Sequence, residues 1–386
     1  MRKHITLAIE EVRRFAVRRF LEGTVSDGRS LAGTVFSVAL IAAFTLVGAT
    51  LNPATAMAAS SRDGAAKKSL FIAVPYPSTS ALINDLNHIC NEHKVPGQED
   101  YIFNAVVQNV ADANGAINGP RKTHLDILVQ YFPGGSTPCF DNAFIGTVYR
   151  EWDWWNRTNP VGPANTRESW KWCWQSKYCG GMLDEAFRWE NINASAVAAS
   201  NFKNMYPGIN VHWYVTYEAN LVWFGNNRYS TSLRQAYEAY LIALIDALQP
   251  YYGTRAVLWS PAFWSKYYSV PYRSRVNIKN QLNTMFRNIK AYTNGPGVTW
   301  LHFQDFMGQA PGYMTTNDVR LWYNLLNSMS YNFASLRVNM EQFGTSVLEH
   351  MERENNYDAS GIPVGASFSM RTWSNTTFGV LSHKDL

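Results

Sequence analysis

The sequence has little charge, and almost no excess of one sign outside its first 58 residues. Charged residues fill 16% of the 386 positions and hydrophobic residues 46%, a balance that excludes an intrinsically disordered chain. Residues 1–58 hold seven of the 34 basic and four of the 29 acidic side chains, which leaves 27 against 25 in the remainder. A net charge of +2 over that remainder offers no basic surface for nucleic acid, so we expect no such partner.

Two further absences narrow the chemistry. No glycine-rich GxGxxG turn follows the first expected strand, so the fingerprint of a dinucleotide-binding fold is missing. The eight histidines form no HxH or HExxH ligand set. The sequence therefore implies neither a metal nor a cofactor.

Cysteine is scarce, and all four cysteines lie beyond residue 58. In an exported chain an even number predicts two disulfides. Cys173 and Cys179 enclose a short Trp-rich loop, so we pair them with each other and Cys90 with Cys139. A zinc site is the alternative, although no pair has the close two-residue spacing and no His cluster accompanies them.

Only one long apolar run is present, at residues 33–51. Basic residues precede it and the small-residue pattern Ala56-Met57-Ala58 follows it, which is typical of a secretory signal peptide. We expect a signal peptide over 1–58, a polar linker over 59–67 and one domain over 68–386, secreted as a monomer. An uncleaved leader is the alternative and would anchor the chain in the cell envelope, because the run approaches membrane-spanning length. Only in that case is the membrane a partner.

The domain reads as extended apolar segments that alternate with helical ones. Eight such segments favour a single α/β domain, a closed (β/α)₈ TIM barrel, with a Trp- and Cys-rich insertion over 153–182 after the third strand. An open doubly wound sheet is the alternative. The expected strands are 69–77, 126–132, 144–152, 210–217, 255–264, 298–306, 335–343 and 365–373, and the clearest helices are 80–93, 183–206, 231–248, 273–292 and 317–329.

The fourth and seventh expected strands each have a glutamate near their end, on the face that carries the strand's more polar residues. Side chains alternate along a strand, so Glu218 shares a face with Tyr214 and Thr216, and Glu341 shares one with Asn339. Both faces are the more polar ones, which we expect to point into the barrel. Two glutamates at the mouth of one barrel suit glycosidic bond cleavage, where one assists the leaving oxygen and the other attacks or activates water. The alternative is that each acid merely caps its strand or pairs with an arginine.

Other residues near expected strand ends are candidates for contact with substrate. Asp305 lies at the end of the sixth strand and is a third candidate for the catalytic group, with a turn-forming role as the alternative. Indole rings beyond strand ends can stack on the C–H face of a sugar. The candidates for substrate binding are Glu151, Trp152, Tyr217, Asn220, Trp223, Trp264 and Gln304.

Three short segments carry a resemblance to a family. The runs 213–218 (WYVTYE), 258–263 (LWSPAF) and 304–308 (QDFMG) are similar to the WYxxxE, SPxF and QDGxG motifs of an uncharacterised group of bacterial TIM-barrel glycosidases. The runs 339–343 and 128–131 resemble a later N-x-E-x-F run and an early strand of that group. The resemblance spans about 125–345 and implies a glycoside hydrolase barrel with Glu218, Asp305 and Glu341 in its site.

Glutamates on the fourth and seventh strands are also similar to those of the large clan of retaining barrel glycosidases. That likeness implies Glu218 as acid/base and Glu341 as nucleophile. Tyr217 stands where the clan usually has Asn, and Phe306 takes the place of the first glycine of QDGxG, so retention and inversion both stay open. We expect a hydrolase acting on a polysaccharide or glycoconjugate. The alternatives are a non-catalytic carbohydrate-binding protein of the same fold and an anchored envelope interaction protein.

The leader generates the first testable prediction. Because a small-residue site follows the apolar run, the exported protein should begin at Ala59. N-terminal sequencing of protein collected outside the cell checks this, and an intact chain recovered in the membrane fraction would show that the leader is an anchor.

Overall fold

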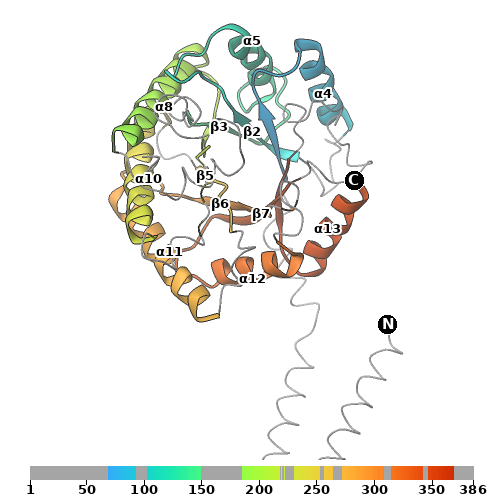
Figure 1. Ribbon diagram of the computed structural model, residues 1–386. Coiled ribbons are helices and arrows are strands. Elements are labelled where there is room, and N and C mark those ends of the chain that lie inside the picture. The colour runs from blue at the N-terminus through green and yellow to red at the C-terminus, as the bar shows by residue number, and fades with distance from the viewer. Residues whose placement is uncertain are drawn as a thin grey trace, which may run out of the picture. The chain divides into compact units, whose positions relative to one another are not determined.

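The structure is a computed structural model that describes residues 68–92, 102–148, 185–217, 219, 221, 230–252, 256–263, 272–305, 307, 314–341 and 347–368. All of them belong to the unit Asp63–Leu386, and strands alternate with helices along it (Figure 1). The strands are β1 Lys68–Ala73, β2 Ile102–Gln108, β3 Asn142–Gly146, β4 His212–Val215, β5 Val257–Trp259, β6 Trp300–Gln304, β7 Ser335–Glu341 and β8 Val364–Phe368. The helices are α4 Thr79–Glu92, α5 Gly119–Leu128, the 3₁₀ turn η1 Val129–Tyr131, α8 Glu185–Met205, α10 Ser230–Tyr252, α11 Tyr272–Tyr292, α12 Thr316–Asn327 and α13 Val347–Ala359.

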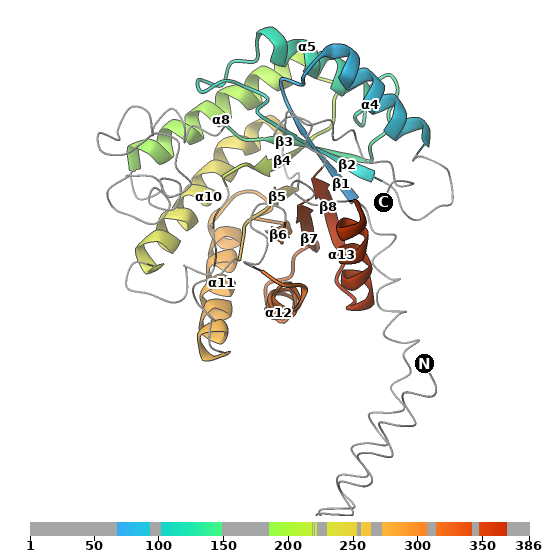
Figure 2. The same ribbon diagram turned by 45° about the vertical axis from the view of Figure 1, so that its right-hand side comes forward.

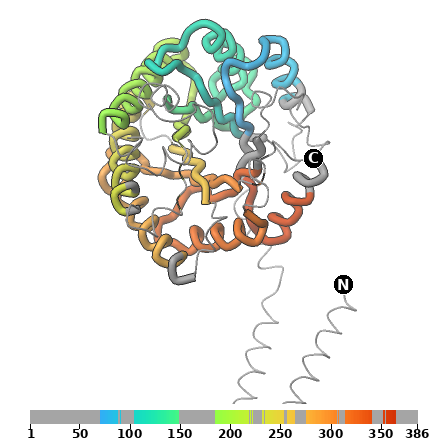
Figure 3. Tube along the Cα trace, viewed as in Figure 1, coloured from blue at the N-terminus to red at the C-terminus, as the bar shows by residue number. Residues whose placement is uncertain are grey.

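The strands form one closed parallel sheet. Each strand pairs with the next in the chain, and β8 pairs with β1 to close the ring. The helices lie outside the strands (Figure 2), and the chain advances around the ring in sequence order (Figure 3). The α/β class and the barrel order are thus confirmed for the described residues. The insertion over 153–182 lies outside them.

One expected strand is wrong. Residues 126–131 are not extended, because they belong to the end of α5 and the turn η1, and Phe132 after the turn is extended but belongs to no strand. Pro120 stands in the first turn of α5, where a missing N–H costs nothing, and Lys122 pairs with Asp126 one turn later at 2.7 Å. The resemblance of the run 128–131 to an early strand therefore fails.

The true second strand, β2, lies upstream of the expected one. Its central residues are apolar and buried, from Ala105 to Val107, whereas Asn104 at its start is polar and fully buried. It pairs with β1 on one edge and β3 on the other, and all four of these residues are 0% exposed, so neither face meets solvent there.

Alternation of the strand side chains sorts the core into two layers. The larger layer lies between strands and helices and includes Trp213 and Val215 of β4 and Val338 and Met340 of β7. The smaller one lies inside the ring and contains the intervening residue, Tyr214. The members of this inner cluster are Phe71, Ala73, Val106, Phe144, Tyr214 and Leu258. The predicted inward faces of the fourth and seventh strands are therefore confirmed for the residues whose side chains are described.

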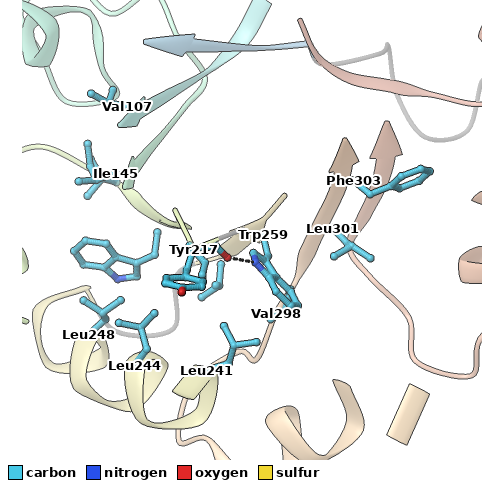
Figure 4. Packing of buried hydrophobic residues seen from close by; sticks show 14 of the residues in the cluster. Val107, Ile145, Tyr217, Leu241, Leu244, Leu248, Trp259, Val298, Leu301 and Phe303 are labelled. Carbon is cyan, nitrogen blue, oxygen red and sulfur yellow. Dashed lines mark hydrogen bonds between the residues drawn. The ribbon is translucent and has the colours of Figure 1, made fainter. Parts of the chain in front are cut away.

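The helices present their apolar stripes to the outer layer. Leu241, Leu244 and Leu248 of α10 point toward the strands, where Trp259 of β5 packs (Figure 4). Each is at most 1% exposed, and burying such a side chain stabilises the fold by about 1.5–3 kcal/mol. α12 begins with a capping box between Thr315 and Asp318, which satisfies amide groups at its first turn.

One expected disulfide is confirmed. Cys90 of α4 is bonded to Cys139, in the segment between η1 and β3, with the two Cα atoms 5.7 Å apart. The bridge links α4 to the segment just before β3. In the sequence, the wrongly expected strand 126–132 lies between the two cysteines. The other expected pair, Cys173 and Cys179, lies outside the described residues.

Removal of this bridge should destabilise the domain. The bond closes a loop of 49 residues, so the Cys90→Ala/Cys139→Ala variant should lose about 4 kcal/mol of unfolding free energy through the greater entropy of its unfolded chain. Denaturant unfolding measures this. Cys90→Ala alone also opens the bridge and should lose a similar amount, and unchanged midpoints in both variants would contradict the prediction.

Candidate active site at the carboxyl end of the barrel

The carboxyl ends of β4 and β7 reach the same end of the ring. Glu341 is the last residue of β7, and its backbone pairs in register with Phe368 of β8. The position of its side chain lies outside what the structure describes, and so does the whole of Glu218. Alternation along the sequence predicts inward positions for both residues, because Glu341 comes two residues after Asn339 and Glu218 two residues after Thr216.

Below Glu341, three uncharged polar side chains form a buried cluster that we call the amide floor: Ser260, Gln304 and Asn339. They follow or belong to β5, β6 and β7, and each is at most 1% exposed. Nε2 of Gln304 donates to the carbonyl oxygen of Ser260 at 3.0 Å, and Nδ2 of Asn339 donates to the hydroxyl oxygen of Ser260. The amide oxygens of Gln304 and Asn339 accept no hydrogen bond from any described residue. The floor thus holds buried acceptors at the level just beneath the strand ends.

On the other side of the ring, a threonine pair fixes the end of β4. The hydroxyl of Thr216 donates to the carbonyl oxygen of Thr147 at 2.7 Å, and the Thr216 N–H donates to the Thr147 hydroxyl at 3.2 Å. Gly146 permits this approach, since a Cβ there would lie 2.8 Å from Cγ2 of Thr216 and from the Val107 carbonyl oxygen. Thr216 is the last described inward residue before Glu218.

Asp305 faces away from the interior. Gln304 points inward, so the next side chain points toward the helices, where Nη1 of Arg353 lies 2.9 Å from Oδ2 of Asp305. The Tyr357 hydroxyl donates to the same oxygen at 3.0 Å, and the Met307 N–H donates to Oδ1 at 3.2 Å. Asp305 is fully buried, and Arg353 is 5% exposed. The Asp305 side chain therefore lies outside the barrel interior, and its expected catalytic role stays a prediction.

Tyr217 also belongs to the outer layer. Its ring packs edge-on against Phe187, Tyr237 and Tyr240 of α8 and α10. Its carbonyl oxygen accepts a hydrogen bond from Nε1 of Trp259 at 2.8 Å (Figure 4). The side chain is 3% exposed, so the expected substrate contact by this ring is wrong.

Among the remaining candidates, Gln304 alone lies within the described residues, at the inner face in the amide floor, and its role in substrate binding stays a prediction. The others, whose roles also stay predictions, are Glu151, Trp152, Asn220, Trp223 and Trp264.

The opposite, amino-terminal half of the interior carries a polar cluster that the sequence analysis missed. The Nε2 of His302 lies 2.9 Å from the Ser335 hydroxyl, which also accepts from Nε of Arg337 at 3.1 Å. The ring of Trp300 stacks on His302. Burial, and next the nearby Arg337 charge, hold the pKa of His302 well below its ordinary value, so its ring stays neutral.

Sequence signals for the other missed residues were partial. Arg353 and Tyr357 are one helical turn apart, a spacing that places both on one face, but nothing in the sequence links that face to Asp305.

Among the described residues, no group of three or more His, Cys, Asp or Glu side chains is arranged to hold a metal ion. Within the same part of the chain, every helix is too short or too polar to cross a bilayer.

Comparisons with known proteins add little to this geometry. No protein-family model and no curated protein matches the chain. Among the solved structures that match is a "putative alpha-L-fucosidase" from Bacteroides thetaiotaomicron VPI-5482. The two chains are 11% identical, the match covers 84% of this chain and 95% of the other, and the TM-score is 0.47. We therefore draw the function from this chain's own residues.

The buried histidine generates a prediction on stability. Because the folded pKa of His302 lies below the unfolded value of 6.5, unfolding takes up a proton at lower pH. The unfolding free energy should be undiminished above about pH 6.5 and fall below it, by up to about 1.4 kcal/mol per pH unit from this group. Urea unfolding of the wild type and of His302→Gln at a series of pH values measures the difference in slope. Above about pH 7 the two curves should run parallel, and equal slopes below about pH 6 would contradict the assignment.

Proposed function

We propose that the chain is an exported glycoside hydrolase that cleaves O-glycosidic bonds in a polysaccharide or glycoconjugate. The observation that carries the proposal is the inward alternation of β4 and β7, seen at Tyr214 and Asn339. The same alternation in the sequence predicts inward positions at one mouth for Glu218 and Glu341. In barrels of this architecture the chemistry takes place at the carboxyl ends of the strands.

In the proposed mechanism, Glu218 is the general acid/base and Glu341 the nucleophile. Protonated Glu218 gives its proton to the leaving oxygen while the Glu341 carboxylate attacks the anomeric carbon and forms a glycosyl-enzyme ester. Glu218 then removes a proton from water, which attacks the same carbon and releases a sugar of retained configuration. This route requires the two carboxyl groups about 5–5.5 Å apart, whereas a gap of about 6.5–9.5 Å would favour inversion.

The surroundings of the mouth support carboxylate chemistry. The amide floor beneath Glu341 carries no formal charge, so it neither neutralises a carboxylate nor locks it in an ion pair. Oε1 of Gln304 is buried and has no donor among the described residues, so it suits a buried water, which has a hydrogen to donate. The proposed reaction uses no cofactor, and the enzyme acts as a monomer.

The glutamate assignment is tested by isosteric substitution. Glu218→Gln and Glu341→Gln keep the side-chain shape and remove the charge and the proton, so each should lower kcat by roughly 10²–10⁴-fold with KM little changed. Reducing-end assays on a panel of cell-wall and plant polysaccharides provide the measurement. Glu185→Gln, at the exposed start of α8, is the control and should match the wild type.

Small anions distinguish the two roles. Azide should restore activity to Glu341→Ala and yield a glycosyl azide of inverted configuration, whereas Glu218→Ala should give a product of retained configuration. Near-wild-type kcat in both Gln variants would refute the assignment and leave Glu151 and Asp305 as the remaining acids. Sugar binding without hydrolysis by the wild type would instead favour a non-catalytic carbohydrate-binding protein.

A further inference from the structure

The geometry points to Asp305, Arg353 and Tyr357 as positioning residues for the nucleophile Glu341, an inference that rests on the proposed function. We call these three side chains the α13 clamp. None of them is placed to touch substrate, because Asp305 is fully buried and directed to the helix layer, and Arg353 and Tyr357 meet it there.

The clamp contains a buried charge pair whose carboxylate, that of Asp305, accepts three hydrogen bonds. One carboxylate receives an N–H from Arg353, a hydroxyl from Tyr357 and a backbone N–H from Met307. An ionised carboxylate away from water is tolerated only with such partners. The carboxylate therefore holds the residues just after β6 and the middle of α13 in one fixed relation.

The clamp also connects to the strand that carries Glu341. The backbone N–H of Asp305 donates to the carbonyl oxygen of Asn339 at 3.0 Å, two residues before Glu341. The side chain of Asn339 donates to Ser260 after β5. The ends of β5, β6 and β7 are thereby joined to one another, and the clamp joins them to α13.

Chain connectivity makes α13 the relevant helix. Glu341 ends β7, and α13 is the next element, with Arg353 twelve residues further along the chain. The clamp therefore fixes the strand end before Glu341 through Asn339 and the helix after it through Arg353. A nucleophile held at both sides keeps the attack geometry on which the rate depends, and a displacement of about 1 Å can cost about 10²-fold in rate.

The test is steady-state kinetics of the full-length protein with matched controls. Tyr357→Phe removes one hydroxyl and keeps the ring, and should lower kcat about 10-fold with KM nearly unchanged. Its control is Tyr331→Phe, which removes a hydroxyl that donates to the Val298 carbonyl oxygen just before β6, at the opposite end of the barrel, and should keep wild-type kcat. Asp305→Asn should lower kcat about 10²-fold, and Glu238→Gln, which breaks the comparable Arg234 pair within α10 at 2.9 Å, should not.

A double variant separates positioning from stability. Asp305→Asn alone leaves the Arg353 charge buried without its counter-ion, which is destabilising, whereas Asp305→Asn/Arg353→Met removes both charges. The double variant should recover much of the Tm lost by Asp305→Asn without recovering kcat. Recovery of both would mean that the clamp only stabilises the fold and would overturn the inference.

The remaining outcomes are also decisive. Wild-type kcat in Tyr357→Phe and in Asp305→Asn, with Glu341→Gln inactive, would overturn the clamp and leave the proposed function intact. Asp305→Asn as inactive as Glu341→Gln, with Tyr357→Phe at wild-type kcat, would make Asp305 itself catalytic. Absence of hydrolysis by the wild type, or full kcat in Glu218→Gln and Glu341→Gln, would overturn the proposed function and the positioning role together.

Discussion

The structure depends on one constraint, the burial of both faces of a closed parallel sheet. Every strand has two neighbours, so its backbone groups are paired on both edges and its side chains must fill either the ring or the space under the helices. Tyr214 fills the ring beside Phe71, with centroids 5.4 Å apart, while Trp213 on the other face packs against Tyr252 of α10. Only where the strands end is an inward side chain released from this packing. The proposed chemistry is for that reason assigned to the strand ends.

The same constraint divides the polar groups of the interior into two sets. The inner cluster of Phe71, Val106 and their neighbours occupies the middle of the ring. On the amino-terminal side, His302 is kept neutral by burial and bonds to Ser335, an arrangement that serves stability. On the carboxyl side, the amide oxygens of Gln304 and Asn339 have no donor among the described residues, and Nδ1 of His302 on the amino-terminal side has no partner there either. The two sets therefore differ in the residues that they contain and in their distance from the strand ends.

The sequence predicted which side chains of β4 and β7 face inward, because more polar and apolar residues alternate along both strands. It failed at β2, where Ala105, Val106 and Val107 form a continuous apolar run of a strand buried on both faces, a pattern without period. The run 126–132 is also rich in apolar residues, but its start belongs to α5. The buried residues of that helix, His124, Leu125 and Leu128, stand at helical spacing. Periodicity does not separate two such short runs. The partners of Asp305 lie 48 and 52 residues away, so no local pattern could reveal them.

A buried ion pair is a poor way to stabilise a core, because the desolvation of two charges offsets most of their attraction and apolar side chains of the same volume often do as well. An ion pair adds a defined geometry, because the carboxylate of Asp305 accepts hydrogen bonds from donors on α13 and on the residues after β6 in one arrangement. Apolar contacts would not define that arrangement so narrowly.

A defined hydrogen-bond geometry is most useful at a strand end, where pairing with the neighbouring strands stops. β7 ends at Glu341 and β6 at Gln304, so both lose their pairing at the mouth. The Asp305 bond to the Asn339 carbonyl oxygen continues the pairing between β6 and β7 past the last residue of β6, and Arg353 fastens that point to the helix that follows Glu341. The charge pair therefore lies where a less directional contact would leave the proposed nucleophile free to shift.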